Sequence, residues 1–404
     1  MSMAILKKVL VIVLTLVLLT GLKHLLDRYN PTSIIFHYNL LTCIQYFLLM
    51  GVLLWLVLYL LFRYVFKRSL RASVFWIIFL LLLGGCEGFF YYVLRNSEKT
   101  SGRLHALLTE YYLTYEINFP QLSYDSVLSY TLKKNAVYDH DNIEFSNQVH
   151  ANKQGLRDDN ASLVKPSIIC LGDSYTMGWG VKKEEAFPEL IEHKTGLRVL
   201  NAGITSYGTA RQLLLLNRLD TANLQYLVIQ YCYNDYEENK AFLESGRYLP
   251  AGSRQTQERT HASYQLARTY FPFKYTLTLC RMYLRDQLSD RSDTAAHARS
   301  YVQPSASALL EILYKSNCNF RKWKIFIIDT NRYPAYDHYL LESVESLLKK
   351  NNFSDDFRKS IHIVKFPELN KQRYFYPLDN HLNREGHEFV ANQLLSAMQL
   401  NGRN

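Results

Sequence analysis

The sequence lacks the residue patterns of a metal or redox site. Its six cysteines are scattered, with no C-x-x-C pair and no metal-ligand spacing. They stand at positions 43, 86, 170, 232, 280 and 318. We therefore expect no metal and no other cofactor. Cys280 and Cys318 could pair in an oxidising compartment, but the sequence leaves their proximity open.

The sequence also lacks a nucleic-acid signature, although its formal net charge is +10. Its basic residues are dispersed among many acidic ones, and no helix face is basic throughout. We expect no nucleic-acid partner. The basic balance fits attraction to anionic lipid or to an anionic polymer.

Long apolar runs are absent beyond residue 94, but three precede it, at 5–22, 40–62 and 73–94. About 20 apolar residues cross a bilayer as a helix, so residues 1–94 are predicted to form a membrane region with about three transmembrane helices. The first run also resembles a signal peptide, because Lys7 and Lys8 precede its apolar core. Residues 19–22 offer no small-x-small cleavage site, which favours an uncleaved span.

Four basic residues lie in the short loop between the second and third runs, namely Arg63, Lys67, Arg68 and Arg71. Short positive loops stay in the cytoplasm, so the chain after Leu94 is predicted to be extracytoplasmic in a multi-pass membrane protein. Cleavage of the first run would leave this orientation unchanged. Glu87 within the third run raises a functional hypothesis, but the aromatic residues at 89–92 favour a carboxylate that reaches the outer interface.

Residues 95–150 are interpreted as a connecting segment, with a helix at 103–113 and strands and turns at 121–147. Residues 151–404 alternate between apolar strand patterns and helical patterns, which predicts an α/β domain with a parallel sheet covered on both sides. Strands are expected at 167–171, 198–201, 226–231, 323–328 and 361–364, and helices at 184–194, 209–219, 339–350 and 384–400. An insertion at 237–301 either shapes substrate binding or only packs.

Polar residues follow the first three predicted strands, and one further polar stretch precedes the final helix. The four stretches are Gly172-Asp173-Ser174, Asn201-Ala202-Gly203, Tyr233-Asn234-Asp235 and Asp379-Asn380-His381. Open parallel sheets place their ligands at the carboxyl ends of the strands. We therefore expect these stretches to converge at one edge of the sheet.

Acyl transfer by a serine needs a nucleophile, a base and a group that orients the base. Ser174, His381 and Asp379 supply these three roles. Donors to the developing oxyanion are available from the backbone N–H groups of Ser174 and Gly203 and from the side-chain amide of Asn234. We predict these residues as the catalytic and oxyanion-hole groups.

The four stretches together resemble the blocks of the SGNH (GDSL-like) hydrolase superfamily, over roughly residues 150–400. The resemblance implies a three-layer, flavodoxin-like parallel sheet. Two positions depart from the family's pattern: Cys232 replaces a glycine in the third block, and one residue instead of two separates Asp379 from His381. Some related membrane-associated members share the shorter spacing.

Nearby polar residues are predicted to have supporting roles. Asp173 is expected to order the turn before Ser174, and Asp235 to organise the loop of Asn234. Asn383 stands where it can cap the final helix. His387 is expected to pack or lie at the surface.

The combined reading is a membrane-anchored extracytoplasmic serine esterase or O-acyltransferase that acts on ester groups of an envelope or surface glycan or lipid. An acyl-serine would pass its acyl group to water or to a sugar hydroxyl, and the residues do not choose between these acceptors. The alternative is a non-catalytic membrane-tethered scaffold or assembly subunit that retains the fold. The sequence does not identify the membrane proteins with which such a subunit would assemble.

Overall fold

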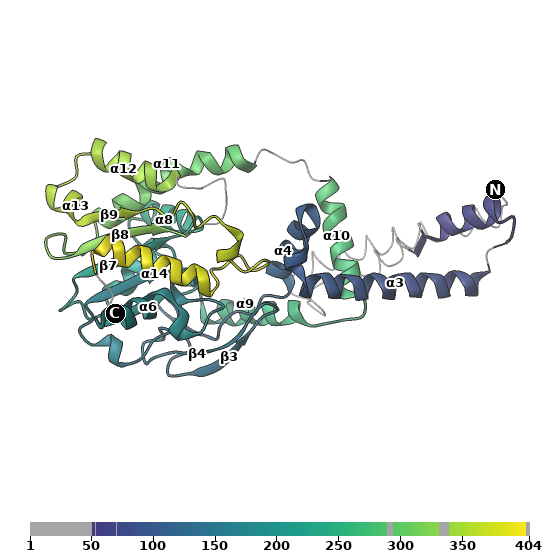
Figure 1. The fold of residues 1–404 in the computed structure, drawn as a ribbon, viewed down its shortest axis with the longest axis horizontal. Coiled ribbons are helices and arrows are strands. Elements are labelled where there is room, and N and C mark those ends of the chain that lie inside the picture. Colours follow the sequence, from purple (N-terminus) through teal and green to yellow (C-terminus); the bar gives the residue numbers. More distant parts are fainter. Residues whose placement is uncertain (1–50, 53, 70, 289–293, 331–338, 401–404) are drawn as a thin grey trace. The chain divides into compact units, whose positions relative to one another are not determined.

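A computed structural model describes residues 51–400, except 53, 70, 289–293 and 331–338 (Figure 1). The first predicted span and residues 40–50 of the second lie outside the described residues. The chain divides into two compact units. The first contains the described residues up to Ile117 together with 260–288, and the second contains 118–259 and 294–400.

The second unit is built on a five-stranded parallel sheet. Its strands are β5 (Ile168–Gly172), β6 (Val199–Gly203), β7 (Tyr226–Tyr231), β8 (Lys324–Asp329) and β9 (Ile361–Val364). They lie in the order β6-β5-β7-β8-β9, which is the flavodoxin-like order. The predicted α/β fold with a parallel sheet is therefore confirmed. The strand order reverses between β5 and β7, where ligands bind in sheets of this kind.

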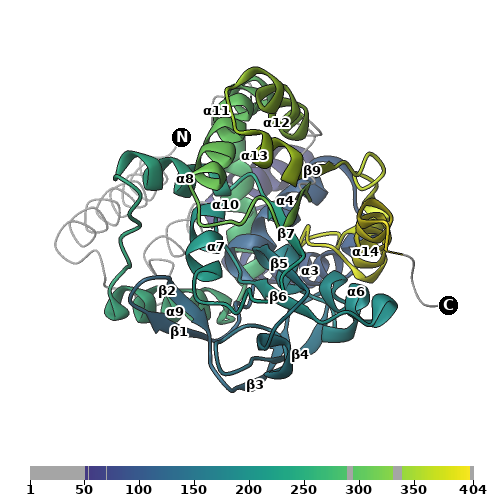
Figure 2. The same cartoon turned by 90° about the vertical axis from the view of Figure 1, so that its left-hand side faces the viewer.

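Helices cover both faces of the sheet (Figure 2). One face packs against α6 (Phe187–Thr195) and α14 (Arg384–Met398). The opposite face packs against α7 (Thr209–Leu216), α8 (Asp235–Glu244), α11 (Thr294–Tyr314) and α12 (Tyr339–Lys350). Within β5, Ile168 and Cys170 contribute to the first core, and Ile169 and Leu171 to the second, as the two-residue period of a strand requires. This arrangement gives the three predicted layers.

Short elements complete the second unit. Two antiparallel hairpins occupy the segment predicted as strands and turns: β1 (Leu122–Asp125) pairs with β2 (Ser129–Leu132), and β3 (Val137–Asp141) with β4 (Ser146–His150). Two short helices are α5 (Ser174–Met177) and α13 (Asp355–Ser360). Helix α9 (Arg254–Arg268) contains the boundary between the units.

The first unit is helical. It contains η1 (Leu61–Val65), α3 (Ala72–Arg95), η2 (Ser97–Lys99), α4 (Gly102–Tyr115) and α10 (Lys274–Leu288). Among the described residues, one helix is long and apolar enough to cross a membrane, Ser73–Arg95, and residues Leu54–Val65 form a shorter apolar helix. Residues 260–288 of the expected insertion belong to this unit.

Candidate active site

Ser174 is the first residue of α5, directly beyond the carboxyl end of β5. Two glycines allow α5 to sit against the sheet at this point. Gly172 of β5 and Gly203 of β6 are register partners. A Cβ at Gly172 would lie 2.1 Å from Thr176 Oγ1, and a Cβ at Gly203 would lie 2.3 Å from the Met177 backbone nitrogen. Larger residues at either position would displace the helix that carries Ser174.

Ser174, His381 and Asp379 form a continuous hydrogen-bonded chain. Nε2 of His381 lies 2.7 Å from Oγ of Ser174, and Nδ1 of His381 is hydrogen-bonded to Oδ1 of Asp379. Asp379 is fully shielded from solvent, whereas the His381 side chain is 15% exposed. A neutral imidazole with its proton on Nδ1 donates to Asp379 and leaves Nε2 free to accept the serine proton.

The loop that carries Asp379 and His381 is fixed by residues from distant parts of the chain. Glu144, which lies between β3 and β4, accepts hydrogen bonds from the backbone N–H groups of Leu378 (3.0 Å) and Asp379 (2.8 Å). The hydroxyl of Tyr175 donates to the backbone carbonyl of Asn380 (2.9 Å). Asn380 adopts φ +62°, a conformation that asparagine tolerates better than most residues. The turn at Asn380 allows the side chains of Asp379 and His381, which are only two residues apart, to hydrogen-bond to each other.

Trp179 contacts both members of the acid–base pair. Its indole N–H donates to Oδ2 of Asp379 at 3.1 Å, so the two carboxylate oxygens accept from two different rings. The indole also stacks on the His381 imidazole, with ring centroids 5.0 Å apart and an interplanar angle of 21°. The ring of His140 packs edge-on against Trp179, and burial lowers the pKa of His140 to about 4. The His140 ring beside Trp179 is therefore neutral at neutral pH.

A buried guanidinium holds the loop that carries Trp179. Arg157 is 1% exposed and donates to the backbone carbonyls of Met177 (3.3 Å), Gly178 and Val181 (2.7 Å). Burial lowers the pKa of Arg157 to about 10, so it stays protonated at neutral pH. Burying such a charge is costly unless its donors are satisfied. Backbone carbonyls accept from both terminal nitrogens of the guanidinium, whereas its Nε has no hydrogen-bond partner among the described residues. The arrangement ties the segment after Ser174 to the turn at residues 152–157.

The predicted oxyanion donors differ in their surroundings. Asn234 follows the carboxyl end of β7, the neighbour of β5, and is exposed to solvent. The Gly203 N–H donates instead to Oδ1 of Asn201 at 3.1 Å, so this predicted donor is already engaged. Asn201 reaches it because the two residues are separated by one position at the end of β6. The donor roles of Ser174, Gly203 and Asn234 stay predictions.

The cysteine at the unusual position of the third block fits the backbone. Cys232 does not have a positive φ, so its backbone conformation does not require a glycine there. Its thiol donates to the carboxylate of Asp173, and burial raises the pKa of the thiol well above its ordinary value. Asp173 in turn accepts from the Tyr175 N–H at 2.9 Å. The predicted role of Asp173 in ordering the turn is confirmed.

The other supporting residues lie as the sequence predicts. Asn383 caps α14 by accepting from the Gly386 N–H at 3.1 Å. His387 is buried, and its Nδ1 accepts from the Phe187 N–H at 3.3 Å. Asp235 accepts from the N–H of Cys232 at 3.4 Å and from the hydroxyl of Thr209 at 2.7 Å. These residues fix the elements around the site without contacting its serine and histidine.

Cys280 and Cys318 both carry free thiols in the structure. They belong to different units of the chain, Cys280 to the first and Cys318 to the second. The disulfide that the sequence left open is therefore not formed here. Cys318 lies beside Ser316 at a separate cavity of the second unit.

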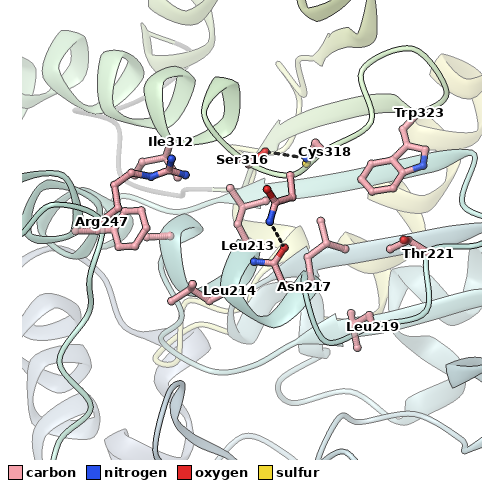
Figure 3. A pocket seen from close by; sticks show the side chains of 14 residues that line it. Leu213, Leu214, Asn217, Leu219, Thr221, Arg247, Ile312, Ser316, Cys318 and Trp323 are labelled. Atoms are coloured by element: carbon pink, nitrogen blue, oxygen red, sulfur yellow. Dashed lines mark hydrogen bonds between the residues drawn. The ribbon is translucent and has the colours of Figure 1, made fainter.

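Figure 3 shows the side chains that line that cavity of about 220 Å³. It lies at the amino ends of the strands, whereas Ser174 follows the carboxyl end of β5. Trp323, which lines it, directly precedes β8, and Leu219 and Thr221 precede β7. Two of its polar side chains satisfy each other, because the amide of Asn317 donates to Oδ1 of Asn217 at 3.2 Å. The cavity is thus separate from the serine and histidine described above.

Sequence reasoning did not identify Trp179, Glu144 or Arg157. Trp179 had a visible signal, because it is a large aromatic residue within the glycine-containing segment that follows Ser174. Glu144 and Arg157 had none that separates them from ordinary loop residues. Their contacts join segments that folding alone brings together.

No protein-family model and no curated protein matches the chain. Solved structures similar to it include lipolytic proteins of the G-D-S-L family, the family that the four blocks resemble. One, from Desulfitobacterium hafniense DCB-2, has 12% identity and a TM-score of 0.31, covering 57% of this chain and 98% of that one. A GDSL-like lipase from Bacteroides ovatus ATCC 8483 has 12% identity and a TM-score of 0.31, covering 60% and 56%. The lipase Lip_vut3 from a goat rumen metagenome has 15% identity and a TM-score of 0.30, covering 57% and 96%.

Proposed function

We propose that the chain is a serine esterase or O-acyltransferase that forms an acyl-enzyme on Ser174. The observation that supports this proposal is the hydrogen-bonded chain from Ser174 through His381 to Asp379. Nucleophile, base and orienting carboxylate stand in the order that serine acyl transfer needs. Burial of Asp379 strengthens its interaction with the imidazolium that forms during the reaction.

The reaction begins when Oγ of Ser174 attacks the ester carbonyl carbon. Its proton passes to Nε2 of His381, and the carbonyl π electrons move to oxygen. The Ser174 N–H and the Asn234 amide are proposed to stabilise this oxyanion, because Asn234 follows the carboxyl end of β7, the strand beside β5. A contribution from Gly203 would require its N–H to leave Asn201.

Collapse of the tetrahedral intermediate breaks the ester C–O bond and releases the alcohol, which takes the proton from His381. An acyl group then remains on Ser174. Water or a sugar hydroxyl next attacks this acyl-serine, with His381 accepting the attacking proton and returning a proton to Oγ of Ser174. Water gives a carboxylic acid, and a hydroxyl gives a new ester.

We further propose that the enzyme is a multi-pass membrane protein with its second unit outside the cytoplasm. Helix 73–95 is long and apolar enough to span, and the basic residues at 63, 67, 68 and 71 precede it. The location favours ester groups on an envelope or surface glycan or lipid as substrates. A reporter fused after Asn404 should give an extracytoplasmic signal, and a cytoplasmic signal would overturn the orientation.

The serine assignment is tested with a fluorophosphonate probe on the full-length protein in detergent. Wild-type protein should be labelled on Ser174, and Ser174→Ala should lose the label. Ser162→Ala is a matched control, because Ser162 is also buried but hydrogen-bonds to Asp158 at 3.0 Å. An unlabelled wild type, or equal labelling of Ser174→Ala, would refute the nucleophile and favour the non-catalytic scaffold.

A further inference from the structure

The start of helix α10 packs against α3. The contacted part of α3 belongs to the apolar stretch that is proposed to span the membrane. Figure 1 shows α4 and α10 gathered toward one end of α3. Phe273, just before α10, packs against the cluster formed by Phe75, Phe79 and Leu83 of α3. Leu83 precedes Arg95 by 12 residues, or roughly 18 Å at 1.5 Å per helical residue. The start of α10 therefore lies alongside the apolar part of α3, away from its polar end.

Glu87 of α3 receives the free N–H groups at the start of α10. Its carboxylate accepts from the backbone N–H groups of Tyr275 (3.2 Å) and Thr276 (2.8 Å). It also accepts from the hydroxyls of Thr276 (2.9 Å) and Tyr270 (3.1 Å). The first N–H groups of a helix have no partner within the helix, and in water they can bond to solvent. In hydrocarbon a protein group must satisfy them, and Glu87 does so here.

The charge of Lys274, the first residue of α10, is also paired inside the protein. The Lys274 ammonium lies 2.8 Å from Glu116 and donates to the backbone carbonyls of Tyr115 and Arg268. Its side chain is 3% exposed. A buried cation with a carboxylate and two carbonyl partners suits a site without water.

The sequence of α10 changes character along its length. Residues 275–280 carry no charge, and charged residues begin at Arg281, followed by Arg285 and Asp286. Arg285 forms an exposed ion pair with Glu110 of α4. The residues before the helix, Tyr270 to Phe273, are also uncharged, and Lys274, which lies between the two uncharged stretches, is buried and paired with Glu116. This gradient fits a helix that starts in lipid and ends in water.

We infer that residues 270–280 form a membrane-embedded tip that enters the outer leaflet beside α3. The partner is the phospholipid bilayer itself, and the tip anchors the first unit at a second place besides its spanning helix. This inference rests on the proposal that α3 crosses the membrane. It requires neither the nucleophile role of Ser174 nor any substrate.

The test places nitroxide spin labels on single cysteines of the full-length protein, reconstituted in vesicles of phosphatidylcholine and phosphatidylglycerol. The labelled positions are 272, which is exposed at the tip, 287, which is exposed near the other end of α10, and Cys86, which is exposed on α3. Oxygen concentrates in lipid, whereas a water-soluble nickel chelate stays outside. Labels at 86 and 272 should collide mainly with oxygen, and the label at 287 mainly with the chelate.

The outcomes distinguish the embedded tip at residues 270–280 from the proposal that α3 spans the membrane. A lipid signal at 86 with a water signal at 272 would overturn the embedded tip and leave the span intact. A water signal at 86 would overturn the span and the tip together. Fluorophosphonate labelling of Ser174 in the same vesicles reports on the enzyme proposal independently.

The wild-type protein provides a second measurement that needs no cysteine replacement. A phosphatidylcholine with a photoreactive diazirine in its acyl chain should cross-link to residues 270–280 as well as to α3. Mass spectrometry of the digested protein locates the cross-links. Cross-links confined to α3 would refute the embedded tip.

Discussion

Each unit of the protein buries a carboxylate, and the two carboxylates differ in what they bind. Asp379 in the second unit accepts from two rings, the imidazole of His381 and the indole of Trp179. Glu87 in the first unit accepts from two backbone N–H groups and two hydroxyls. Both groups escape the cost of unpaired burial. Only Asp379 has an imidazole as its partner, the side chain that most often serves as a general acid or base.

This difference separates a chemical role from a structural one. The imidazole beside Asp379 is also hydrogen-bonded to the hydroxyl of Ser174, the proposed nucleophile. Amides and hydroxyls around Glu87 do not titrate near neutral pH, so its contacts fix the position of α10. An acidic residue within an apolar run raises the hypothesis of a functional role. For Glu87, its contacts with the start of α10 favour a structural role instead. Substitution of Asp379 should lower the reactivity of Ser174, whereas substitution of Glu87 should lower the stability of the protein and leave that reactivity unchanged.

The largest expected effect is on reactivity in Asp379→Asn. Asparagine keeps one acceptor oxygen, but two N–H groups point at this side chain, so one of them would face an amide NH₂. The imidazole would then lose its orientation and tautomer. We expect fluorophosphonate labelling of Ser174 to slow by about 10⁴-fold, the loss this substitution causes in a Ser–His–Asp triad.

The control for this experiment is Asp355→Asn, because Asp355 is exposed at the start of α13. Its labelling rate should equal that of the wild type. Thermal unfolding should show that Asp379→Asn is still folded. A folded Asp379→Asn protein with an unchanged rate would contradict the role of Asp379 and remove the contrast with Glu87.

The groups of the proposed site could be placed from the sequence because parallel strands bring their carboxyl ends to one edge. Ser174 and Asn234 each follow an apolar run, so local pattern and topology were enough to place them. Trp179 and Glu144 contact Asp379 from 200 and 235 residues away. No local period encodes such contacts. The engagement of the Gly203 N–H by Asn201 likewise depends on a side-chain orientation that spacing does not determine.

For the fold as well, elements with a clear local pattern were predictable, and contacts between distant segments were not. The expected ranges of β7, α12 and β9 agree with the structure, because each is an apolar or amphipathic run with clear ends. The predicted insertion near 237–301 lies within the predicted domain 151–404, and its described residues 260–288 group with the first unit. Their partners are Glu87 and Glu116, which the sequence separates from them by more than 150 residues. No local pattern in the sequence indicates partners at such separations.

Replacing the structural carboxylate should affect stability and leave reactivity alone. Glu87→Ala deprives two N–H groups and two hydroxyls of their acceptor, and an unsatisfied buried donor costs about 1–3 kcal/mol. Some of these donors will find new partners, so we expect a loss of about 3 kcal/mol in the free energy of unfolding. Denaturant unfolding in detergent micelles measures this change.

The matched control is Glu98→Gln, because Glu98 is exposed in η2 of the same unit. Its stability should remain within about 0.5 kcal/mol of the wild type. Fluorophosphonate labelling of Glu87→Ala should keep the wild-type rate at temperatures where the protein is folded. Slow labelling of folded Glu87→Ala would show that the two carboxylates are not separate in function.

The smallest expected effect tests whether Trp179 positions the acid–base pair through its N–H. Trp179→Phe keeps an aromatic ring beside His381 but removes the donor to Oδ2 of Asp379. Loss of one hydrogen bond to a charged group costs about 1.5–3 kcal/mol, so we expect labelling of Ser174 to slow by at least about 10-fold. Trp323→Phe is the control, because Trp323 lies at the opposite edge of the sheet. If Trp179→Phe slows the maximal rate of labelling but leaves probe affinity unchanged, the indole orients the reacting groups. Weaker affinity at an unchanged maximal rate would instead assign Trp179 to the binding surface.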